Sequence, residues 1–131
     1  MQLSDAMWRQ KLGEERYAVC RCAATEAPFS GAYWDHHEDG VYHCAACQVP
    51  LFDSTAKYDS GTGWPSFDRA AGAVAEQEDR RHGMVRLEIL CAGCRSHLGH
   101  VFEDSSTATH RRFCVNSLSL QFAGRHTNEE R

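Results

Sequence analysis

Two pairs of cysteines have the spacing Cys-x-x-Cys, at Cys44 and Cys47 and at Cys91 and Cys94. Two thiolates three positions apart on a tight turn can face one cation, and two such turns complete a tetrahedral shell of four sulfurs that suits zinc. Inert buried cysteines or a redox dithiol are the alternative uses of such residues. Because four thiolates leave no open coordination position, the spacing predicts one structural zinc ion per chain.

Three further cysteines, Cys20, Cys22 and Cys114, lie outside these pairs. Cys114 follows Arg111 and Arg112, whose positive charges can stabilise a thiolate. A cysteine in a β-strand is otherwise more often an inert core residue. The sequence therefore makes Cys114 a candidate nucleophile, with burial in the core as the alternative.

Two histidines, His97 and His100, come shortly after the second cysteine pair. Each can be a surface residue, a proton donor or a metal ligand, and the ligand role is the least favoured once four thiolates fill the zinc shell. A thiolate with an imidazole nearby is the minimum set of groups for thiol chemistry with proton delivery.

Trp64 lies in the run 61–67, which contains two glycines and a proline. Such a run is typical of a rigid loop that presents an indole for binding. By composition alone, a core tryptophan beside turn residues is the slightly favoured interpretation.

Helices are predicted only at the N-terminus, in a helical segment over residues 1–24. Ser4 can cap a helix that Gly13 ends, and residues 14–22 form a second short helix. Beyond residue 25 the pattern changes to short alternating segments separated by turns, and residues 41–43, 84–90 and 116–122 have strand spacing. We expect a small, mainly antiparallel β fold, in one domain over residues 1–131 with a disordered tail at 123–131.

The composition is that of an ordinary soluble domain, with 42% hydrophobic and 24% charged residues in 131. A net charge of −4 argues against a nucleic-acid partner. There is neither an apolar run long enough for a membrane span nor the apolar core of a signal peptide. We therefore expect a cytoplasmic protein without a membrane partner, in which cysteines serve metal binding or redox chemistry.

Five segments carry a resemblance to a known family: Thr-Glu-Ala-Pro-Phe-Ser-Gly (25–31), Pro-Leu-Phe (50–52), Lys-Tyr-Asp-Ser-Gly-Thr-Gly-Trp-Pro-Ser-Phe (57–67), His-Leu-Gly-His-Val-Phe (97–102) and Arg-Phe-Cys-Val-Asn-Ser (112–117). In this order they resemble the methionine-R-sulfoxide reductases, the MsrB family, over nearly the whole chain. The resemblance implies two antiparallel β-sheets with short N-terminal helices and a zinc site opposite the active site. It also implies reduction of the R epimer of methionine sulfoxide.

The resemblance also assigns roles to residues of this chain. Cys114 matches the attacking cysteine, and Trp64 matches the indole that receives the methyl group of the substrate, with Phe113 as a second expected substrate contact. The other catalytic residues that it implies are His97, His100, Asn116, Arg112 and Asp104. The expected substrates are proteins or peptides that contain methionine-R-sulfoxide.

Three departures from the family pattern affect these expectations. Thr62 occupies the position where many members have a resolving cysteine, so the usual disulfide with Cys114 cannot form. Ser105 and Ser106 replace the glycine and proline that usually follow Asp104, and His110 replaces a glycine. The first departure bears on how the enzyme is recycled, and the others bear on loop shape.

The expected reaction is attack of the Cys114 thiolate on the sulfoxide sulfur while His97 or His100 delivers a proton to the oxygen. It leaves methionine and a Cys114 sulfenic acid. Cys20 or Cys22 is a possible resolving cysteine, and thioredoxin or a similar dithiol is the expected reductant. The main alternative is a non-catalytic, zinc-stapled binding module on the same scaffold, which has no need of Cys114 beside two histidines.

Overall fold

Two short helices precede the strands in the computed structural model, which describes residues 4–125. Helix α1 (Asp5–Leu12) begins where the Ser4 hydroxyl accepts a hydrogen bond from the backbone N–H of Met7, and it ends at Gly13 with φ +84°. Helix α2 (Glu14–Cys22) has two glutamates in its first turn, where the helix dipole favours negative charge. The predicted pair of N-terminal helices is confirmed within the described residues.

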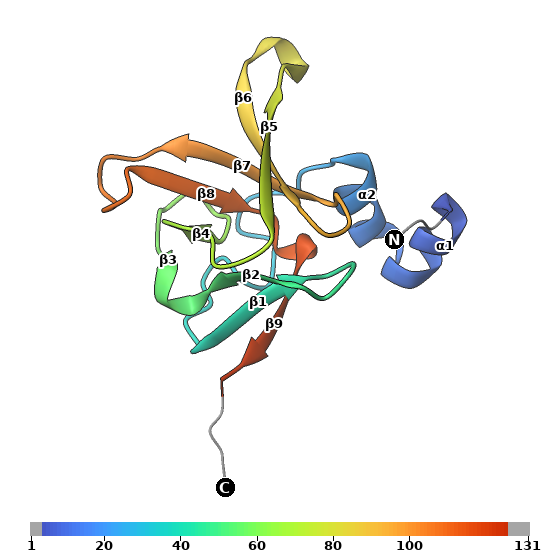
Figure 1. Ribbon diagram of the computed structural model, residues 1–131, viewed down its shortest axis with the longest axis horizontal. Helices are drawn as coiled ribbons and strands as arrows, with labels where there is room; N and C mark the ends of the chain where they lie inside the picture. The colour runs from blue at the N-terminus through green and yellow to red at the C-terminus, as the bar shows by residue number, and fades with distance from the viewer. Residues whose placement is uncertain (1–3, 126–131) are drawn as a thin grey trace, which may run out of the picture.

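Two antiparallel sheets make up the rest of the fold (Figure 1). The smaller sheet has the order β2-β1-β9 and the larger one the order β3-β4-β8-β7-β6-β5. The strands are β1 (Gly40–Cys44), β2 (Pro50–Asp53), β3 (Lys57–Tyr58), β4 (Ser66–Phe67), β5 (Val74–Asp79), β6 (Arg86–Cys91), β7 (His97–Glu103), β8 (Arg111–Val115) and β9 (Leu120–Gly124). The mainly β, two-sheet architecture with N-terminal helices is as predicted.

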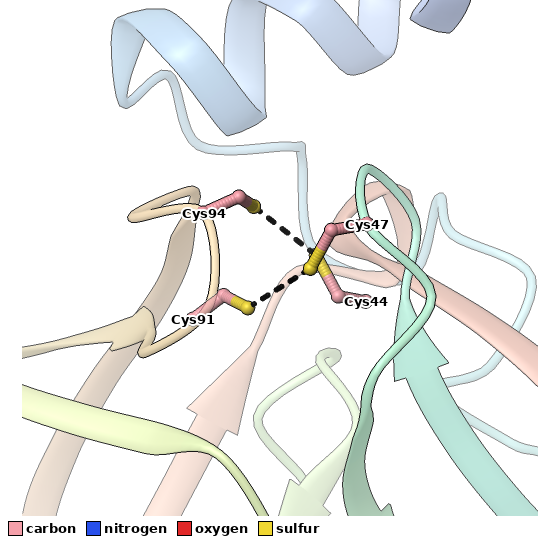
Figure 2. A group of neighbouring side chains, drawn as sticks. All are labelled: Cys44, Cys47, Cys91 and Cys94. Atoms are coloured by element: carbon pink, nitrogen blue, oxygen red, sulfur yellow. Dashed lines mark hydrogen bonds between the residues drawn. The ribbon is translucent and has the colours of Figure 1, made fainter. Parts of the chain in front are cut away.

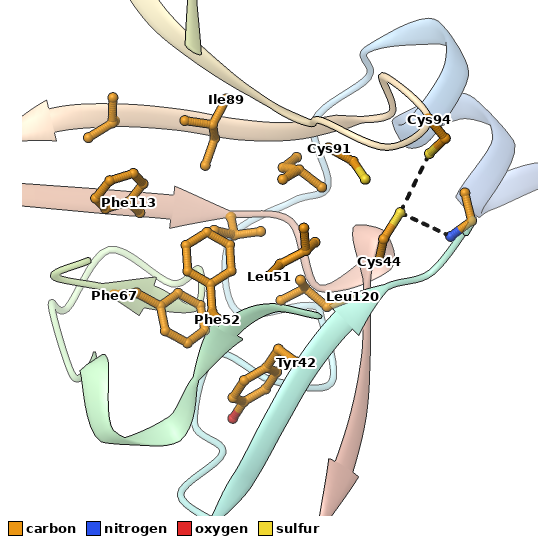
Figure 3. Packing of buried hydrophobic residues seen from close by; sticks show 14 of the residues in the cluster. Tyr42, Cys44, Leu51, Phe52, Phe67, Ile89, Cys91, Cys94, Phe113 and Leu120 are labelled. Carbon is orange, nitrogen blue, oxygen red and sulfur yellow. Dashed lines mark hydrogen bonds between the residues drawn. The ribbon is translucent and has the colours of Figure 1, made fainter. Parts of the chain in front are cut away.

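The hydrophobic core lies between the two sheets (Figure 3). Phe52 of the small sheet stacks on Phe67 of the large sheet with ring centroids 4.4 Å apart, and it meets Phe113 in a T-shaped arrangement at 5.9 Å. Tyr42 meets Phe67 edge to face. Each fully buried side chain of this kind stabilises the fold by about 1.5–3 kcal/mol, so the seam between the sheets is held mainly by aromatic packing.

The other face of the large sheet carries a row of polar side chains that crosses five strands. In the strand register, Ser66 is opposite Cys114, Cys114 opposite His100, His100 opposite Glu88, and Glu88 opposite Gln77. Side chains alternate between faces along a strand, and directly opposed residues lie on the same face. The antiparallel pairing therefore brings residues far apart in sequence into one line.

Two segments differ from the sequence prediction. Residues 117–119 of the expected strand 116–122 form a short 3-10 helix, and β9 begins only at Leu120. The reason is hydrogen bonding to other parts of the chain, because the Ser117 hydroxyl accepts from the backbone N–H of Tyr33 and the Ser119 hydroxyl donates to the carbonyl of His97.

The C-terminal segment also differs in part. Strand β9 pairs with β1 as far as Gly124, and Arg125 forms ion pairs with Asp39 and Asp53, so residues 123–125 are ordered. The remainder of the predicted tail, residues 126–131, lies outside the described residues. Within residues 4–125, no helix has both the length and the apolar character to cross a membrane.

Candidate active site and metal centre

The four paired cysteines come together in one cluster (Figure 2). The sulfurs of Cys44 and Cys94 lie 3.7 Å apart and those of Cys47 and Cys91 lie 3.5 Å apart, and the four ligand atoms all lie within 4.8 Å of one another. With zinc–sulfur bonds of about 2.3 Å, a regular tetrahedron has sulfurs about 3.8 Å apart. The spacing of the sulfurs therefore fits a tetrahedral metal ion.

This cluster joins the two sheets. Cys44 ends β1 of the small sheet and Cys91 ends β6 of the large sheet, and the second cysteine of each pair lies in the turn that follows. A side chain on Gly93 would come within 3.3 Å of the Cys47 sulfur, so glycine at this position leaves room for the thiolates. A metal ion at this point would hold together elements that are 44 or more residues apart in the chain.

A small pocket of about 100 Å³ opens on the polar face of the large sheet. Its walls come from β6, β7, β8, the loop before β4 and the segment before Pro28. The residues that line it are Thr25, Trp64, Arg86, Gly99, His100, Phe102, Cys114, Val115 and Asn116. A cavity of this size holds a few heavy atoms, comparable to the end of one side chain.

Cys114 is half-buried at the edge of this pocket, among hydroxyl groups. Its sulfur lies 3.6 Å from the Thr62 hydroxyl and 4.0 Å from the Ser66 hydroxyl. The Ser60 hydroxyl contacts both of these hydroxyls, at 2.9 and 2.7 Å. These hydroxyl groups are placed to donate hydrogen bonds to the Cys114 sulfur.

His100 is held from behind by a buried carboxylate. Its Nε2 lies 2.7 Å from Asp79, which is almost completely buried and also accepts hydrogen bonds from Arg81 and, at 3.4 Å, from Arg86. Hydrogen bonds from Arg81 and then from His100 hold the pKa of Asp79 well below its usual value. The permanent carboxylate fixes the ring orientation of His100 and makes Nε2 the hydrogen-bond donor of this pair.

His97 reaches the same face through an irregularity in the strand. A register shift between Ile89 and Leu90 displaces the pairing of β7, and the rings of His97 and His100 lie 5.5 Å apart. His97 Nδ1 lies 2.6 Å from Glu88, and its Nε2 is buried without a hydrogen-bond partner among the described residues. Burial keeps the pKa of His97 below its usual value, against the opposing effect of Glu88, so the ring is neutral at pH 7.

Trp64 and Asn116 are tied to the same short segment. The Trp64 indole N–H donates to the carbonyl oxygen of Glu26 at 3.0 Å, and the Asn116 side-chain oxygen accepts from the backbone N–H of Glu26 at 3.0 Å. The Asn116 amide group also donates to the carbonyl of Leu98. Both side chains lining the pocket are therefore fixed by the backbone.

Asp104 and Arg112 lie beside the pocket and not in its wall. Asp104 accepts a hydrogen bond from Tyr58 at 2.7 Å and one from Arg112 at 3.5 Å. Hydrogen bonds from Ser106 and from Tyr58 lower the pKa of Asp104 to about 2. The guanidinium of Arg112 lies 5.3 Å from the centre of the Phe102 ring.

The loop between β7 and β8 keeps its turn despite both departures from the family pattern. Ser106 donates its backbone N–H and its hydroxyl to Asp104, which orders the turn without proline. His110 has φ +61°, in the left-handed region that favours glycine. The substitution of glycine by histidine therefore leaves a strained residue at this position.

Three predicted site residues lie away from the pocket. Phe113 is buried in the core on the opposite face of β8 from Cys114. Cys20 is buried in α2 with its sulfur 4.0 Å from the carbonyl of Leu118, and burial raises the pKa of its thiol to about 11. Cys22 is exposed. None of the hydrogen bonds of the described residues joins Cys114 to Cys20 or Cys22.

Sequence reasoning did not identify Arg86, Glu88 or Asp79 as parts of the site. The alternating strand pattern contained a signal for two of them, since Arg86 and Glu88 fall on one face and Leu87 and Ile89 on the other. Two charged residues on one face of a strand indicate that this face contacts either solvent or other charged groups. Asp79 had no such signal, because it reaches His100 only through the pairing of β5, β6 and β7.

Comparison with known proteins gives one consistent result. Residues 12–124 match the family model described as the SelR domain. Similar curated proteins are named peptide methionine sulfoxide reductase MsrB. That of Thiobacillus denitrificans is 57% identical over 91% of this chain and 92% of the relative, and that of Herminiimonas arsenicoxydans 55% identical over 91% and 88%. That of Thioalkalivibrio sulfidiphilus is 51% identical over 95% and 93%.

Proposed function

Because the chain belongs to the SelR domain family, that of the MsrB methionine sulfoxide reductases, we propose that it reduces methionine-R-sulfoxide in peptides and proteins to methionine through Cys114. The observation that carries this assignment is the position of Cys114 directly opposite His100 in the strand register, in a pocket walled by Trp64. A thiol, an imidazole and an aromatic surface are the groups that the reaction requires.

In the chemical step the Cys114 thiolate attacks the sulfur of the sulfoxide. The attack forms a transient bond between the two sulfurs, and a proton is delivered to the oxygen. As the oxygen passes to the Cys114 sulfur, this bond and the bond between the methionine sulfur and oxygen both break. Methionine is thereby reduced by two electrons, and Cys114 is oxidised to a sulfenic acid. The hydroxyls of Thr62 and Ser66 support the thiolate before the attack.

Of the two histidines, His100 is the better placed to deliver the proton, because it lines the pocket and its ring is oriented by Asp79. His97 is neutral and does not line the pocket. Its role in this scheme is to order the Glu88 side chain behind His100. Asn116 completes the polar wall, and Arg112 and Asp104 order the loop beside it.

Substrate recognition rests on the Trp64 side of the pocket. The S-methyl group of the substrate packs against the indole, a contact with a sulfur component of about 0.3–1.5 kcal/mol. With the oxygen directed at His100 and the methyl group at Trp64, only one of the two epimers presents its sulfur to Cys114. That this epimer is R is inferred from the similarity to proteins named MsrB. Phe113, in the core, takes no direct part.

The metal centre fits zinc, since the donors are four thiolates with the spacing of a tetrahedral shell. We propose that Cys44, Cys47, Cys91 and Cys94 hold one zinc ion with a structural role. Zinc would supply a fixed junction between the two sheets and no chemistry in the pocket. Four reduced thiolates also favour a cytoplasmic location.

Recycling needs a thiol from outside the pocket, because Thr62 and Ser66 stand next to Cys114. A thiol that attacks the sulfenic acid releases water and forms a disulfide, which thioredoxin or a similar dithiol then reduces. Cys22 is exposed, whereas Cys20 is buried and held as the neutral thiol at pH 7. For either to serve as the resolving cysteine, its sulfur must reach that of Cys114. Direct attack by the external dithiol has no such requirement.

The alternative of a non-catalytic binding module on this scaffold is not favoured. A binding module does not require a thiol opposite an imidazole held by a buried carboxylate, and the similar curated proteins are named as reductases. The pocket also has room for only a side-chain end.

The decisive experiment compares the separated R and S sulfoxides of a blocked methionine, with a thioredoxin system as donor. We expect turnover of the R epimer only, and no methionine from Cys114→Ser even in a single turnover, with zinc and fold retained. Methionine formation by Cys114→Ser would exclude Cys114 as the nucleophile. Turnover that persists in a Cys20→Ser, Cys22→Ser double variant would exclude both as required resolving cysteines.

A further inference from the structure

We propose that Glu26 is a positioning residue that fixes Trp64 and Asn116 relative to Cys114, and thereby sets how tightly the pocket holds its substrate. The proposal rests on the reductase function proposed above. Glu26 lies in the segment between α2 and β1 and does not line the pocket, so it acts through the two residues that do.

The backbone of Glu26 connects two walls of the pocket. Its carbonyl oxygen accepts the indole N–H of Trp64 and its N–H donates to the side-chain oxygen of Asn116, both at 3.0 Å. Trp64 comes from the loop before β4, and Asn116 follows β8, two positions after Cys114. A single residue therefore sets the orientation of an indole and a carboxamide that have no hydrogen bond to each other among the described residues.

The side chain of Glu26 anchors that backbone. One carboxylate oxygen accepts the backbone N–H of Leu118 at 3.0 Å, in the 3-10 helix that follows Asn116. Glu26 is only 8% exposed. The anchor thus ties the segment to the same chain turn that carries Asn116, 92 residues away in sequence.

The second carboxylate oxygen of Glu26 is buried and has no hydrogen-bond partner among the described residues. It lies against Gly31, where a Cβ would overlap both this oxygen and the Ser117 hydroxyl. Burying an unpaired carboxylate oxygen costs stability. Glu26 therefore costs stability at a place where an uncharged side chain could pack. Such a cost is consistent with a role in positioning other residues.

Loss of the anchor should loosen Trp64 and Asn116 together, because both hydrogen bonds depend on where the backbone of residue 26 lies. The ground-state complex and the transition state both use these walls, so the main effect is on substrate binding. A hydrogen bond of this kind changes an equilibrium by about tenfold. The expected kinetic signature is a raised KM with a smaller change in kcat.

The test uses four variants of the full-length zinc protein. Glu26→Asp is too short to reach Leu118, Glu26→Gln keeps an acceptor for its N–H, and Gly31→Ala pushes the carboxylate out of its site. Glu103→Ala removes an exposed glutamate and is the control. We expect Glu26→Asp and Gly31→Ala to raise the KM for blocked methionine-R-sulfoxide about tenfold. Glu26→Gln and Glu103→Ala should stay near the wild-type value.

A second measurement does not depend on activity. The indole N–H resonance of Trp64 should shift and exchange faster with water in Glu26→Asp, while those of Trp8 and Trp34 stay unchanged. It should be nearly unaffected in Glu26→Gln. A Trp64→Ala background should abolish most of the KM effect of Glu26→Asp, because positioning through Trp64 cannot add to its loss.

The outcomes separate this proposal from the reductase assignment. An unchanged Trp64 resonance and an unchanged KM in Glu26→Asp overturn the positioning role while wild-type turnover stands. Equal effects of Glu26→Asp on KM in wild-type and Trp64→Ala backgrounds overturn positioning through Trp64, because no part of the effect then depends on the indole. Absence of turnover in the wild type overturns the reductase assignment, and the Trp64 resonance still decides the role of Glu26.

Discussion

The hydroxyl oxygen of Thr62 lies 3.6 Å from the sulfur of Cys114. Bonded sulfurs lie about 2.05 Å apart, so a sulfur at the place of this hydroxyl would have to move closer, by a change of rotamer, to bond with Cys114. Thr62 is therefore placed where a cysteine could reach the nucleophile directly, although threonine itself cannot form a disulfide. Substitution of Thr62 by cysteine therefore tests whether a thiol at this position can resolve the Cys114 sulfenic acid.

Replacing Thr62 with cysteine should create a resolving cysteine. After one equivalent of methionine-R-sulfoxide, we expect a disulfide between positions 62 and 114 in most molecules, detected by peptide mass spectrometry. Thr62→Ser keeps the hydroxyl and should give no such bond. A sulfenic acid that persists at Cys114 in Thr62→Cys would contradict the geometry of this contact.

His100 should matter more to the chemical step than His97. We expect His100→Ala to slow single-turnover methionine formation by about 10²-fold or more, the usual contribution of positioned proton transfer. His97→Ala should have a smaller effect because its ring does not line the pocket. Zinc content, measured alongside, should be unchanged in both, and loss of metal in either would contradict their assignment.

Removing one zinc ligand should unfold the protein. Structural zinc sites supply about 10–16 kcal/mol, comparable to or larger than the total stability of a small domain. We expect Cys91→Ser to lose metal and the circular dichroism of the folded state together. Cys22→Ser, which removes an exposed cysteine, is the matched control. A folded, metal-free Cys91→Ser protein with normal activity would show that the cluster is dispensable.

Stability should depend on the charge of Asp79 in acid. Because the pKa of Asp79 is lowered in the folded state, its ionised form stabilises the fold fully above the ordinary pKa of aspartate, about 3.9, and this contribution declines as the pH falls below it. We expect Asp79→Asn to be destabilised relative to wild type at pH 7 and pH 5, by a similar amount at both. The difference in urea midpoint should shrink below pH 4, and a difference that grows there would contradict the assignment.

Relief of backbone strain should stabilise the β7–β8 loop. His110 has φ +61° and is exposed, so its side chain gains little from the fold. A left-handed conformation costs a residue with a Cβ about 1–2 kcal/mol, and glycine loses part of that gain through its freer unfolded chain. We expect His110→Gly to raise the free energy of unfolding by up to about 1 kcal/mol, as measured by urea denaturation. His110→Ala keeps the Cβ and should give no gain.

Sequence patterns predicted the parts of the molecule that local spacing controls. The two helices follow from capping residues and glycine within one stretch of chain, and the metal cluster follows from two turns that each hold two thiolates. The 3-10 helix at 117–119 escaped prediction, because its serines bond to residues on other elements, including Tyr33 and His97.

The carboxylates that hold the two histidines are brought to them by strand pairing, and the sequence pattern did not predict these contacts. Asp79 reaches His100 across β6, and Glu88 reaches His97 through a shifted register. Single-sequence periodicity indicates which face a residue occupies but not its neighbour on the next strand. For Trp64 the plainer interpretation was core packing, and its indole in fact lines the pocket.

The row of opposed residues through Cys114 means that an error in the register of β8 changes which side chains are exposed. If β8 slipped by one position during folding, Phe113 and Val115 would both turn to the polar face and the Cys114 thiol would turn into the apolar core. In such a molecule the buried Cys114 thiol would not react with oxidants. The exposed apolar side chains would be a surface that chaperones and proteases recognise.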